Sequence, residues 1–295
     1  MTIVYLNGDL LPLEEARVSV LDRGFTFSDG IYEVLPVFQG RIFRLDEHLR
    51  RLDDSLTAIL IRNPHSREEW TRICRDILER NPAEGNQSIY IQVTRGVSDR
   101  DHAFDSTLTP TVFAMCRPVR DRNYGDGVRA ITHEDIRWQY CNIKSTALLA
   151  GVLLRQRALA ADGSREAILV RNGRLTEGAA SNVFIVSGAV IKTPEKDGYI
   201  LPGITRDLVV ELLNNAGFNC METTVTESEL RSADEIWITS STIGIVPVVI
   251  LDGRPVAGGH PGNTWKKADA IYRDFIHGAA AFPDESAGLG TVTSL

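Results

Sequence analysis

The chain has 295 residues, of which 43% are hydrophobic and 24% charged, values that are typical of a folded globular protein. This length exceeds that of an ordinary single domain, so we expect two packed lobes. The net charge is −7 and no run of basic residues occurs, which argues against nucleic acid or an anionic membrane as a partner. A small anionic ligand is not excluded, because it needs only a few donors.

The four cysteines are far apart and form neither a CxxC pair nor a Cys/His cluster with metal-ligand spacing. This pattern predicts reduced thiols in or near the core, no disulfide framework and no metal site. The N-terminus lacks the basic and apolar stretches of a signal peptide, and no apolar run approaches the roughly 20 residues of a membrane span. We therefore expect a cytoplasmic protein. The cysteines are Cys74, Cys116, Cys141 and Cys220.

Residues 1–117 predict a small N-terminal lobe of strands with two helices. Leucine and isoleucine spaced alternately by three and four residues over 45–60 predict an amphipathic helix. Ser66 and Glu69 stand in capping-box positions at the start of a second helix, which should stop at Asn81-Pro82. The strands expected from alternating apolar residues and turn signals are 4–6, 10–13, 31–38, 41–43, 89–95 and 111–116.

Residues 118–127 (PVRDRNYGDG) are polar and without periodicity, which predicts an interdomain linker. A larger C-terminal lobe of antiparallel strands with helices is expected over 128–278, and a loosely ordered tail over 279–295. The Asn172-Gly173 pair between apolar runs predicts a hairpin. The expected strands are 128–132, 167–171, 174–177, 182–186, 189–193 and two more before the last helix. Helices are expected at 145–161, from Thr205 to Gly217, from Thr226, and around 265–275.

One lysine stands out from the others. Only five of the 32 basic residues are lysines, and Lys144 alone lies between an expected strand and an expected helix with apolar neighbours on both sides (CNIKSTALLA). Burying an ammonium is costly unless it is paired or neutralised. Lys144 is therefore either ion-paired within the core or adapted to imine chemistry.

Four further positions could bind a charged ligand, although each also has an ordinary structural interpretation. Thr205 follows Leu201-Pro202-Gly203 at a helix start, where free N–H groups bind anions; it could equally be a simple cap. The hydroxyls at 239–242 follow a strand and could form a polar turn. Arg51 lies next to the apolar face of its helix and could reach over the core toward an anion. Glu177 precedes a Gly-Ala-Ala loop, where its carboxylate would be shielded from water; the alternative is that Glu177 is a surface residue at the end of the hairpin.

Six segments in chain order, spanning nearly the whole chain, resemble the fold-type IV aminotransferases that depend on pyridoxal 5′-phosphate (PLP): GIYEV, EHLRRL, IYIQVTRG, DIRWQYCNIKS, LTEGAASNVF and LPGITRD. That family includes D-amino-acid and branched-chain transaminases and aminodeoxychorismate lyase. Arg100-Asp101-His102, in the loop after the strand that ends at Arg95, is most similar to the D-amino-acid (D-alanine) transaminases. The resemblance implies a two-domain α/β fold and ping-pong transfer of the amino group between D-amino acids and 2-oxo acids such as pyruvate or 2-oxoglutarate.

The resemblance also implies a role for each candidate residue. Lys144 would hold PLP as a Schiff base and shuttle the proton at the substrate Cα, and Glu177 would pair with the protonated pyridine nitrogen. The phosphate would be held by Arg51, Ile204, Thr205, Ser240 and Ser241. The substrate carboxylate would be bound by Tyr32, Arg100 and His102. In the family the last two come from the neighbouring subunit, so a homodimer is implied.

Two departures from the D-alanine type occur. Ala179-Ala180 replaces serines that often follow the Glu-Gly pair, and Ser241 stands where threonine is frequent. The alanine pair leaves the substrate range open. The alternatives on the same scaffold are a branched-chain L-amino-acid transaminase, an (R)-amine transaminase and a lyase of the aminodeoxychorismate type. A PLP-holding protein without turnover is a further alternative. The preferred amino acid and any assembly beyond a dimer are not determined by the sequence.

Overall fold

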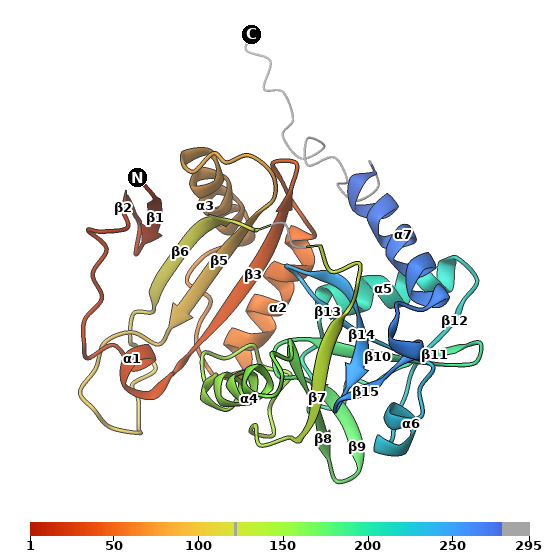
Figure 1. Cartoon of the computed structure of the whole chain (residues 1–295). Helices are drawn as coiled ribbons and strands as arrows, with labels where there is room; N and C mark the ends of the chain where they lie inside the picture. The colour runs from red at the N-terminus through yellow and green to blue at the C-terminus, as the bar shows by residue number, and fades with distance from the viewer. Residues whose placement is uncertain (121–122, 279–295) are drawn as a thin grey trace.

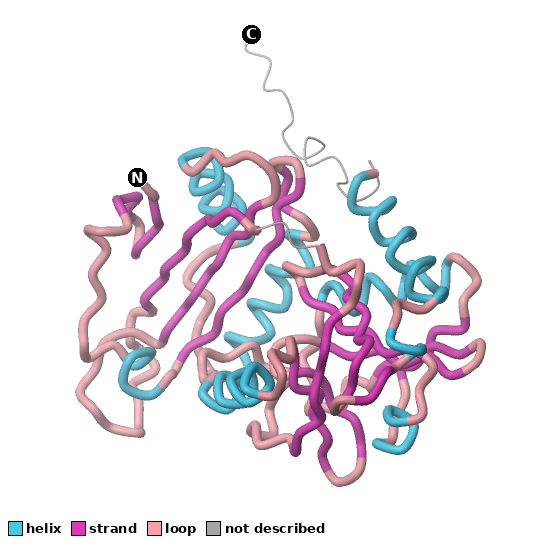
Figure 2. Tube along the Cα trace, in the orientation of Figure 1, coloured by secondary structure: helices cyan, strands magenta, loops and turns pink. Residues whose placement is uncertain are grey.

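Two β-sheets, each covered by helices, make up the part of the chain that the computed structural model describes, residues 1–120 and 123–278 (Figure 1). The strands of the N-terminal part and those of the C-terminal part form separate groups, with helices beside and between them (Figure 2). This arrangement confirms the expected α/β fold class.

The first sheet has six strands in the order β2–β1–β6–β5–β3–β4, and every neighbouring pair is antiparallel. Helices α2 (Leu45–Ala58) and α3 (Arg67–Arg80) bury their apolar stripes in the core of this sheet. The capping box of Ser66 and Glu69 is formed as expected. The strands are β1 (Ile3–Leu6), β2 (Asp9–Pro12), β3 (Gly30–Phe38), β4 (Arg41–Ile42), β5 (Gln87–Thr94) and β6 (Thr111–Pro118); a short helix, α1 (Arg23–Phe27), precedes β3.

The second sheet has nine strands and is mixed. Its order is β12–β11–β10–β13–β14–β7–β8–β9, with β15 also paired to β14. The pairs β7–β8, β7–β14 and β11–β12 are parallel, so the expected antiparallel pattern holds only for the other pairs. The strands are β7 (Val128–Glu134), β8 (Glu166–Arg171), β9 (Arg174–Gly178), β10 (Asn182–Ser187), β11 (Val190–Thr193), β12 (Asn219–Glu222), β13 (Glu235–Ser240), β14 (Gly244–Leu251) and β15 (Arg254–Pro255).

Four α-helices accompany the second sheet. Helices α5 (Ile204–Asn215) and α7 (Asn263–His277) share an apolar core with it, whereas α4 (Leu149–Ala160) packs on β8 and α6 (Glu227–Arg231) near β9 and β10. A 3-10 turn, η1 (Ala257–Gly259), follows β15. Phe43 belongs to the N-terminal part of the chain but is buried in the core that α5 and α7 share, so the two sheets are held together by packing.

The helix expected from residue 145 begins later, at Leu149. Residues 144–146 pair with the start of β3 instead: the carbonyl of Lys144 accepts from the Tyr32 N–H at 2.9 Å, and the Thr146 N–H donates to Gly30 at 2.9 Å. These hydrogen bonds to another strand replace those of a first helical turn. Lys144 therefore lies in an extended segment that is tied to β3.

Several other expectations can be compared with the structure. The hairpin at Asn172-Gly173 is formed, and both residues have the positive φ angles of 52° and 74° that the turn requires. All four cysteines are free and buried, as expected. Within the described residues there is no helix long and apolar enough to span a membrane, and no cluster of potential metal ligands. The tail expected over 279–295 and residues 121–122 of the expected linker lie outside the described residues; the domain limits stay predictions.

Candidate active site

A cavity of about 720 Å³ opens between the two sheets, bounded by β3, α4 and the N-terminus of α5. Eight of the ten residues singled out from the sequence line it, although they come from segments far apart in the chain. These eight are Tyr32, Arg51, Lys144, Glu177, Ile204, Thr205, Ser240 and Ser241. Arg100 and His102 are not among its lining residues.

Lys144 presents its amine to this cavity from a well-anchored backbone. Its carbonyl is bound by the Tyr32 N–H, and its own N–H lies 3.4 Å from the Ser55 hydroxyl. The ammonium lies 4.3 Å from the centre of the Tyr32 ring, a cation–π contact. Within residues 1–120 and 123–278 no carboxylate forms an ion pair with Lys144. The ion-paired interpretation of this lysine is therefore not supported, and its amine is available to a ligand.

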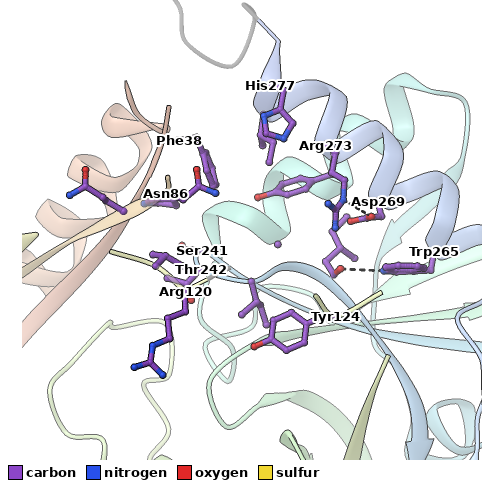
Figure 3. Close-up of a pocket in the computed structure, with 18 of the residues that line it drawn as sticks. Phe38, Asn86, Arg120, Tyr124, Ser241, Thr242, Trp265, Asp269, Arg273 and His277 are labelled. Carbon is purple, nitrogen blue, oxygen red and sulfur yellow. Dashed lines mark hydrogen bonds and ion pairs between the residues drawn. The ribbon is translucent and has the colours of Figure 1, made fainter. Parts of the chain in front are cut away.

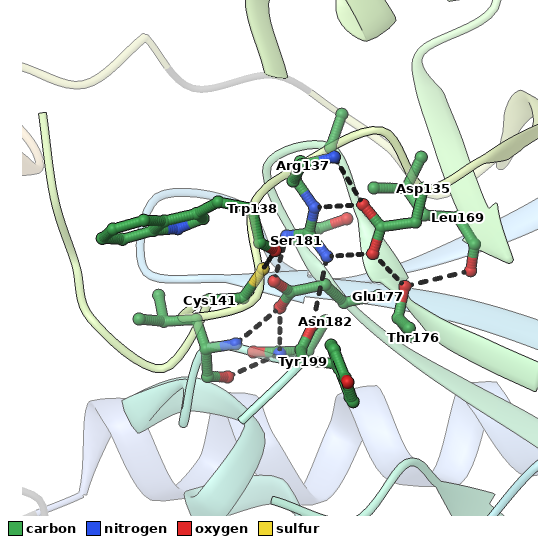
Figure 4. A network of polar contacts seen from close by, with 12 residues as sticks. Asp135, Arg137, Trp138, Cys141, Leu169, Thr176, Glu177, Ser181, Asn182 and Tyr199 are labelled. Carbon is green, nitrogen blue, oxygen red and sulfur yellow. Dashed lines mark hydrogen bonds and ion pairs between the residues drawn. The ribbon is translucent and has the colours of Figure 1, made fainter. Parts of the chain in front are cut away.

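Glu177 lies at the end of β9 and is buried. One carboxylate oxygen accepts from Arg137, and the other accepts from the Asn182 amide at 2.9 Å and from the Leu201 N–H at 3.0 Å (Figure 4). Burial raises the pKa of Glu177 to about 7, although Arg137 and the Leu201 N–H favour the charged form. A cationic ligand atom near this carboxylate would compensate the cost of burying its charge.

Arg137 is itself fixed by a second carboxylate. Asp135, at the end of β7, binds the guanidinium through both oxygens at 2.9 Å and also accepts from the Thr176 hydroxyl at 3.0 Å (Figure 4). Burial opposes the ionisation of Asp135. The hydrogen bonds and the charge of Arg137 outweigh this effect of burial, so the pKa of Asp135 is lowered. A chain of charges thus runs from Asp135 through Arg137 to Glu177 and the cavity.

Arg51 is buried on α2, whereas its neighbour Arg50 is exposed. It binds Glu33 with two parallel hydrogen bonds of 2.7 and 2.9 Å and the Pro202 carbonyl at 2.9 Å. Burial opposes the ionisation of Glu33. The charge and hydrogen bonds of Arg51, followed by those of His48, outweigh this effect of burial and hold the pKa of Glu33 well below its ordinary value. Since the guanidinium carries five N–H groups, one on each terminal nitrogen remains free for an anion in the cavity.

The N-terminus of α5 supplies further donors. The helix is capped at Gly203 with no side-chain hydrogen bond, so the N–H groups of Ile204 and Thr205, two residues that line the cavity, have no intrahelical partner. A Cβ at Gly203 would collide with the Asn182 side chain. Nearby, the buried Thr239 hydroxyl has no hydrogen-bond partner within the described residues. This unpartnered hydroxyl, the free N–H groups and Arg51 form a donor set that fits a phosphate.

A second cavity, of about 510 Å³, is lined by Ser241, Thr242 and the start of β14 (Figure 3). It is bounded by α7, by Asn86 and Gln87, and by Arg120 and Tyr124. Ser241 borders both cavities, but the second one contains no lysine, and its one carboxylate, Asp269, is paired with Arg273 at 2.7 Å. The first cavity is therefore the candidate active site.

Arg100 and His102 lie in an exposed loop outside the cavity. The Arg100 guanidinium lies 5.2 Å from the centre of the Phe27 ring, and the His102 ring lies 5.4 Å from it. Phe27 itself lines the cavity. The loop is therefore next to the cavity mouth, but within one chain the two side chains do not enter it.

The profile of the family described as amino-transferase class IV matches residues 30–251. The chain belongs to this family. It is 39% identical over 275 residues to the D-alanine aminotransferase of Bacillus licheniformis, covering 92% of this chain and 96% of that protein. The D-alanine aminotransferase of Staphylococcus haemolyticus is 36% identical over 280 residues, covering 94% and 98%. Among solved structures, the branched-chain aminotransferase of Thermoproteus uzoniensis superposes with a TM-score of 0.85 at 26% identity, covering 93% of this chain and 94% of that one.

Sequence reasoning about this class IV aminotransferase missed the residues behind the cavity wall. Asp135 and Arg137 stand in the quoted segment DIRWQYCNIKS, but no spacing shows that Arg137 contacts Glu177, 40 residues further on, or that Asp135 fixes Arg137. Glu33 and His48 were also missed. One signal was available for Glu33, because a carboxylate inside an apolar strand (GIYEVLPVF) needs a buried partner.

Proposed function

We propose that this enzyme transfers amino groups between D-amino acids and 2-oxo acids with PLP bound in the cavity. The observation that carries the proposal is the convergence on one cavity of an unpaired lysine, a buried carboxylate and a set of phosphate donors. When bound, PLP supplies an imine-forming aldehyde and a ring that accepts the electron pair released at the substrate α-carbon.

Each residue then has a defined task. The Lys144 amine would hold the cofactor and then accept the proton from the substrate Cα, and no carboxylate of the described residues competes for it. Glu177, fixed by Arg137, keeps a positive charge on the ring nitrogen. Arg51 and the α5 N-terminus, with Ser240 and Ser241, hold the phosphate. The lining of the cavity includes Trp138 and several aliphatic side chains, which exclude water from the reacting atoms.

The substrate carboxylate is bound by Tyr32, Arg100 and His102 in this proposal. Arg offers a planar pair of donors that matches a carboxylate, and His adds a third. Fixing the carboxylate on one side decides which enantiomer presents its Cα–H to Lys144. The D-alanine specificity in the names of the two curated relatives, at 39% and 36% identity, supports D-amino acids as substrates of this chain.

A homodimer completes the site in this proposal, with Arg100 and His102 reaching the neighbouring subunit. Its support is the apolar surface of α4 beside the cavity, where Leu149 is 73% and Val152 59% exposed although both line the cavity wall. Apolar surface of this kind is typical of an interface. A cytoplasmic location is supported by the four free, buried cysteines.

The second candidate is a branched-chain L-amino-acid transaminase, which the structural similarity to the Thermoproteus uzoniensis enzyme favours. A panel of amino donors separates the two. The PLP-loaded enzyme is assayed with both enantiomers of alanine, glutamate and leucine, with pyruvate or 2-oxoglutarate as acceptor. We expect turnover of D-enantiomers and little of L-enantiomers; a preference for L-leucine would overturn the proposal in favour of the second candidate.

A further inference from the structure

The loop that carries Arg100 and His102 is held from inside the protein by one buried arginine. Arg23, the first residue of α1, is 3% exposed. Its guanidinium donates to the carbonyls of Asp101 at 2.6 Å, His102 at 3.2 Å and Ala103 at 3.5 Å. Three consecutive carbonyls of an exposed loop thus converge on a single side chain.

Arg23 is in turn fixed by a carboxylate. One oxygen of Asp29 accepts from Arg23 Nε at 2.9 Å and from Arg95 Nε at 2.7 Å. Arg95 donates to the Ile59 carbonyl at 2.7 Å and lies 3.6 Å from the centre of the Phe104 ring, at the end of the loop. Asp29 and Arg95 therefore connect Arg23 to α2 and β5, the rigid part of the N-terminal lobe.

Arg23 also touches the wall of the cavity. Its guanidinium lies 4.6 Å from the centre of the Phe27 ring, the same ring that Arg100 and His102 approach. Arg23 thus holds the loop backbone directly and contacts the Phe27 ring, which the two functional side chains of the loop also approach. A displacement of the loop at this point would move both side chains relative to any carboxylate they bind.

We propose that Arg23 is a positioning residue that sets the loop of Arg100 and His102 for the substrate carboxylate, an inference that rests on the proposed function. Arg23 does not contact the substrate itself; it acts through the three carbonyls. A lysine at this position retains the charge and can pair with Asp29, but a single ammonium lacks the flat, wide guanidinium that spans three carbonyls.

The test compares Arg23→Lys with the wild-type holoenzyme in D-alanine/2-oxoglutarate kinetics. We expect KM for D-alanine to rise about tenfold or more, since small misplacement of a binding group has effects of this order. The kcat at saturating D-alanine and the cofactor absorption should stay within about twofold of wild type. Arg17→Lys is the matched control, because Arg17 is exposed and, within residues 1–120 and 123–278, donates only to the carbonyls of Glu14 and Ala16.

A double variant separates positioning from general stability. If Arg23 acts through the loop, Arg23→Lys should raise KM much less in an Arg100→Ala background than in wild type. Equal factors in both backgrounds, or a fall of kcat and cofactor content with KM unchanged, would overturn the inference. Asp29→Asn keeps the size of the side chain and should also raise KM for D-alanine, by a smaller factor. This variant replaces Arg23→Lys in the test if Arg23→Lys does not fold. If wild type prefers L-amino acids, or if Arg100→Ala leaves KM unchanged, the proposed function fails instead.

Discussion

Replacing Glu177 with glutamine should slow turnover and at the same time change how the stability of the cofactor-free protein depends on pH. Glutamine keeps the shape of the side chain but offers only one acceptor oxygen. If that oxygen keeps its contacts with Asn182 and Leu201, the NH₂ group of the glutamine faces the Arg137 guanidinium. Both groups are hydrogen-bond donors, so the hydrogen bond to Arg137 is lost. Arg137 retains Asp135, so the site should stay folded and PLP should still bind.

The size of the pH effect follows from the pKa of Glu177. Burial raises this pKa from its ordinary value of 4.5 to about 7, so the folded apoprotein binds the Glu177 proton more tightly than the unfolded chain does. Stability from this group is therefore complete below pH 4.5 and declines as pH rises towards 7, by about 3 kcal/mol at most. Glu177→Gln lacks this decline. Loss of the negative charge should also lower kcat by about 10²-fold.

The assay is urea unfolding of the apoprotein of wild type and Glu177→Gln at several values between pH 5 and 8, together with kcat of both holoenzymes. We expect the free energy of unfolding of wild type to fall relative to that of the variant as pH rises. Parallel curves would show that Glu177 titrates normally. Unchanged kcat would show that its charge is not used in the reaction.

Three further replacements test the other parts of the site. Lys144→Ala should abolish transamination and the cofactor link that borohydride reduces; a link that persists would assign the cofactor to another lysine. Arg51→Ala should weaken PLP affinity by about 10- to 150-fold, the equivalent of about 1.5–3 kcal/mol for a charge-assisted contact. The variant should also be less stable, because the buried Glu33 loses its partner. Full PLP affinity with a collapsed kcat would make Arg51 a catalytic group. Arg100→Ala should raise KM for D-amino acids by about tenfold or more with PLP binding intact, and equal losses on D-alanine and on an (R)-amine without a carboxylate would contradict its role.

Local sequence signals predicted those elements whose stability is itself local. The capping boxes at Ser66 and Thr226 and the Asn172-Gly173 turn depend on residues two or three positions apart, and all are formed. The leucine stripe of α2 needs only an apolar surface to pack on. Arg51 is buried because it lies on the inward face of α2, whereas Arg50 is exposed because it lies on the outward face.

Features that depend on contacts distant in sequence were not predicted. The helix expected from residue 145 begins at Leu149 because β3, more than a hundred residues earlier, takes the hydrogen bonds of 144–146. The contact of Arg137 with Glu177 exists because β8 pairs with both β7 and β9, so the chain that leaves the end of β7 lies one strand away from β9. Neither segment contains a local signal for its partner.

Mass spectrometry tests directly whether Lys144 holds the cofactor. The PLP-loaded enzyme is reduced with borohydride and digested, and the peptide that carries the cofactor mass is identified. The chain has only five lysines, so the assignment is unambiguous. We expect the label on Lys144 alone, and we expect it to be lost when D-alanine is added without a 2-oxo acid before the reduction. A label on Lys192, Lys196, Lys266 or Lys267, or none at all, would contradict it.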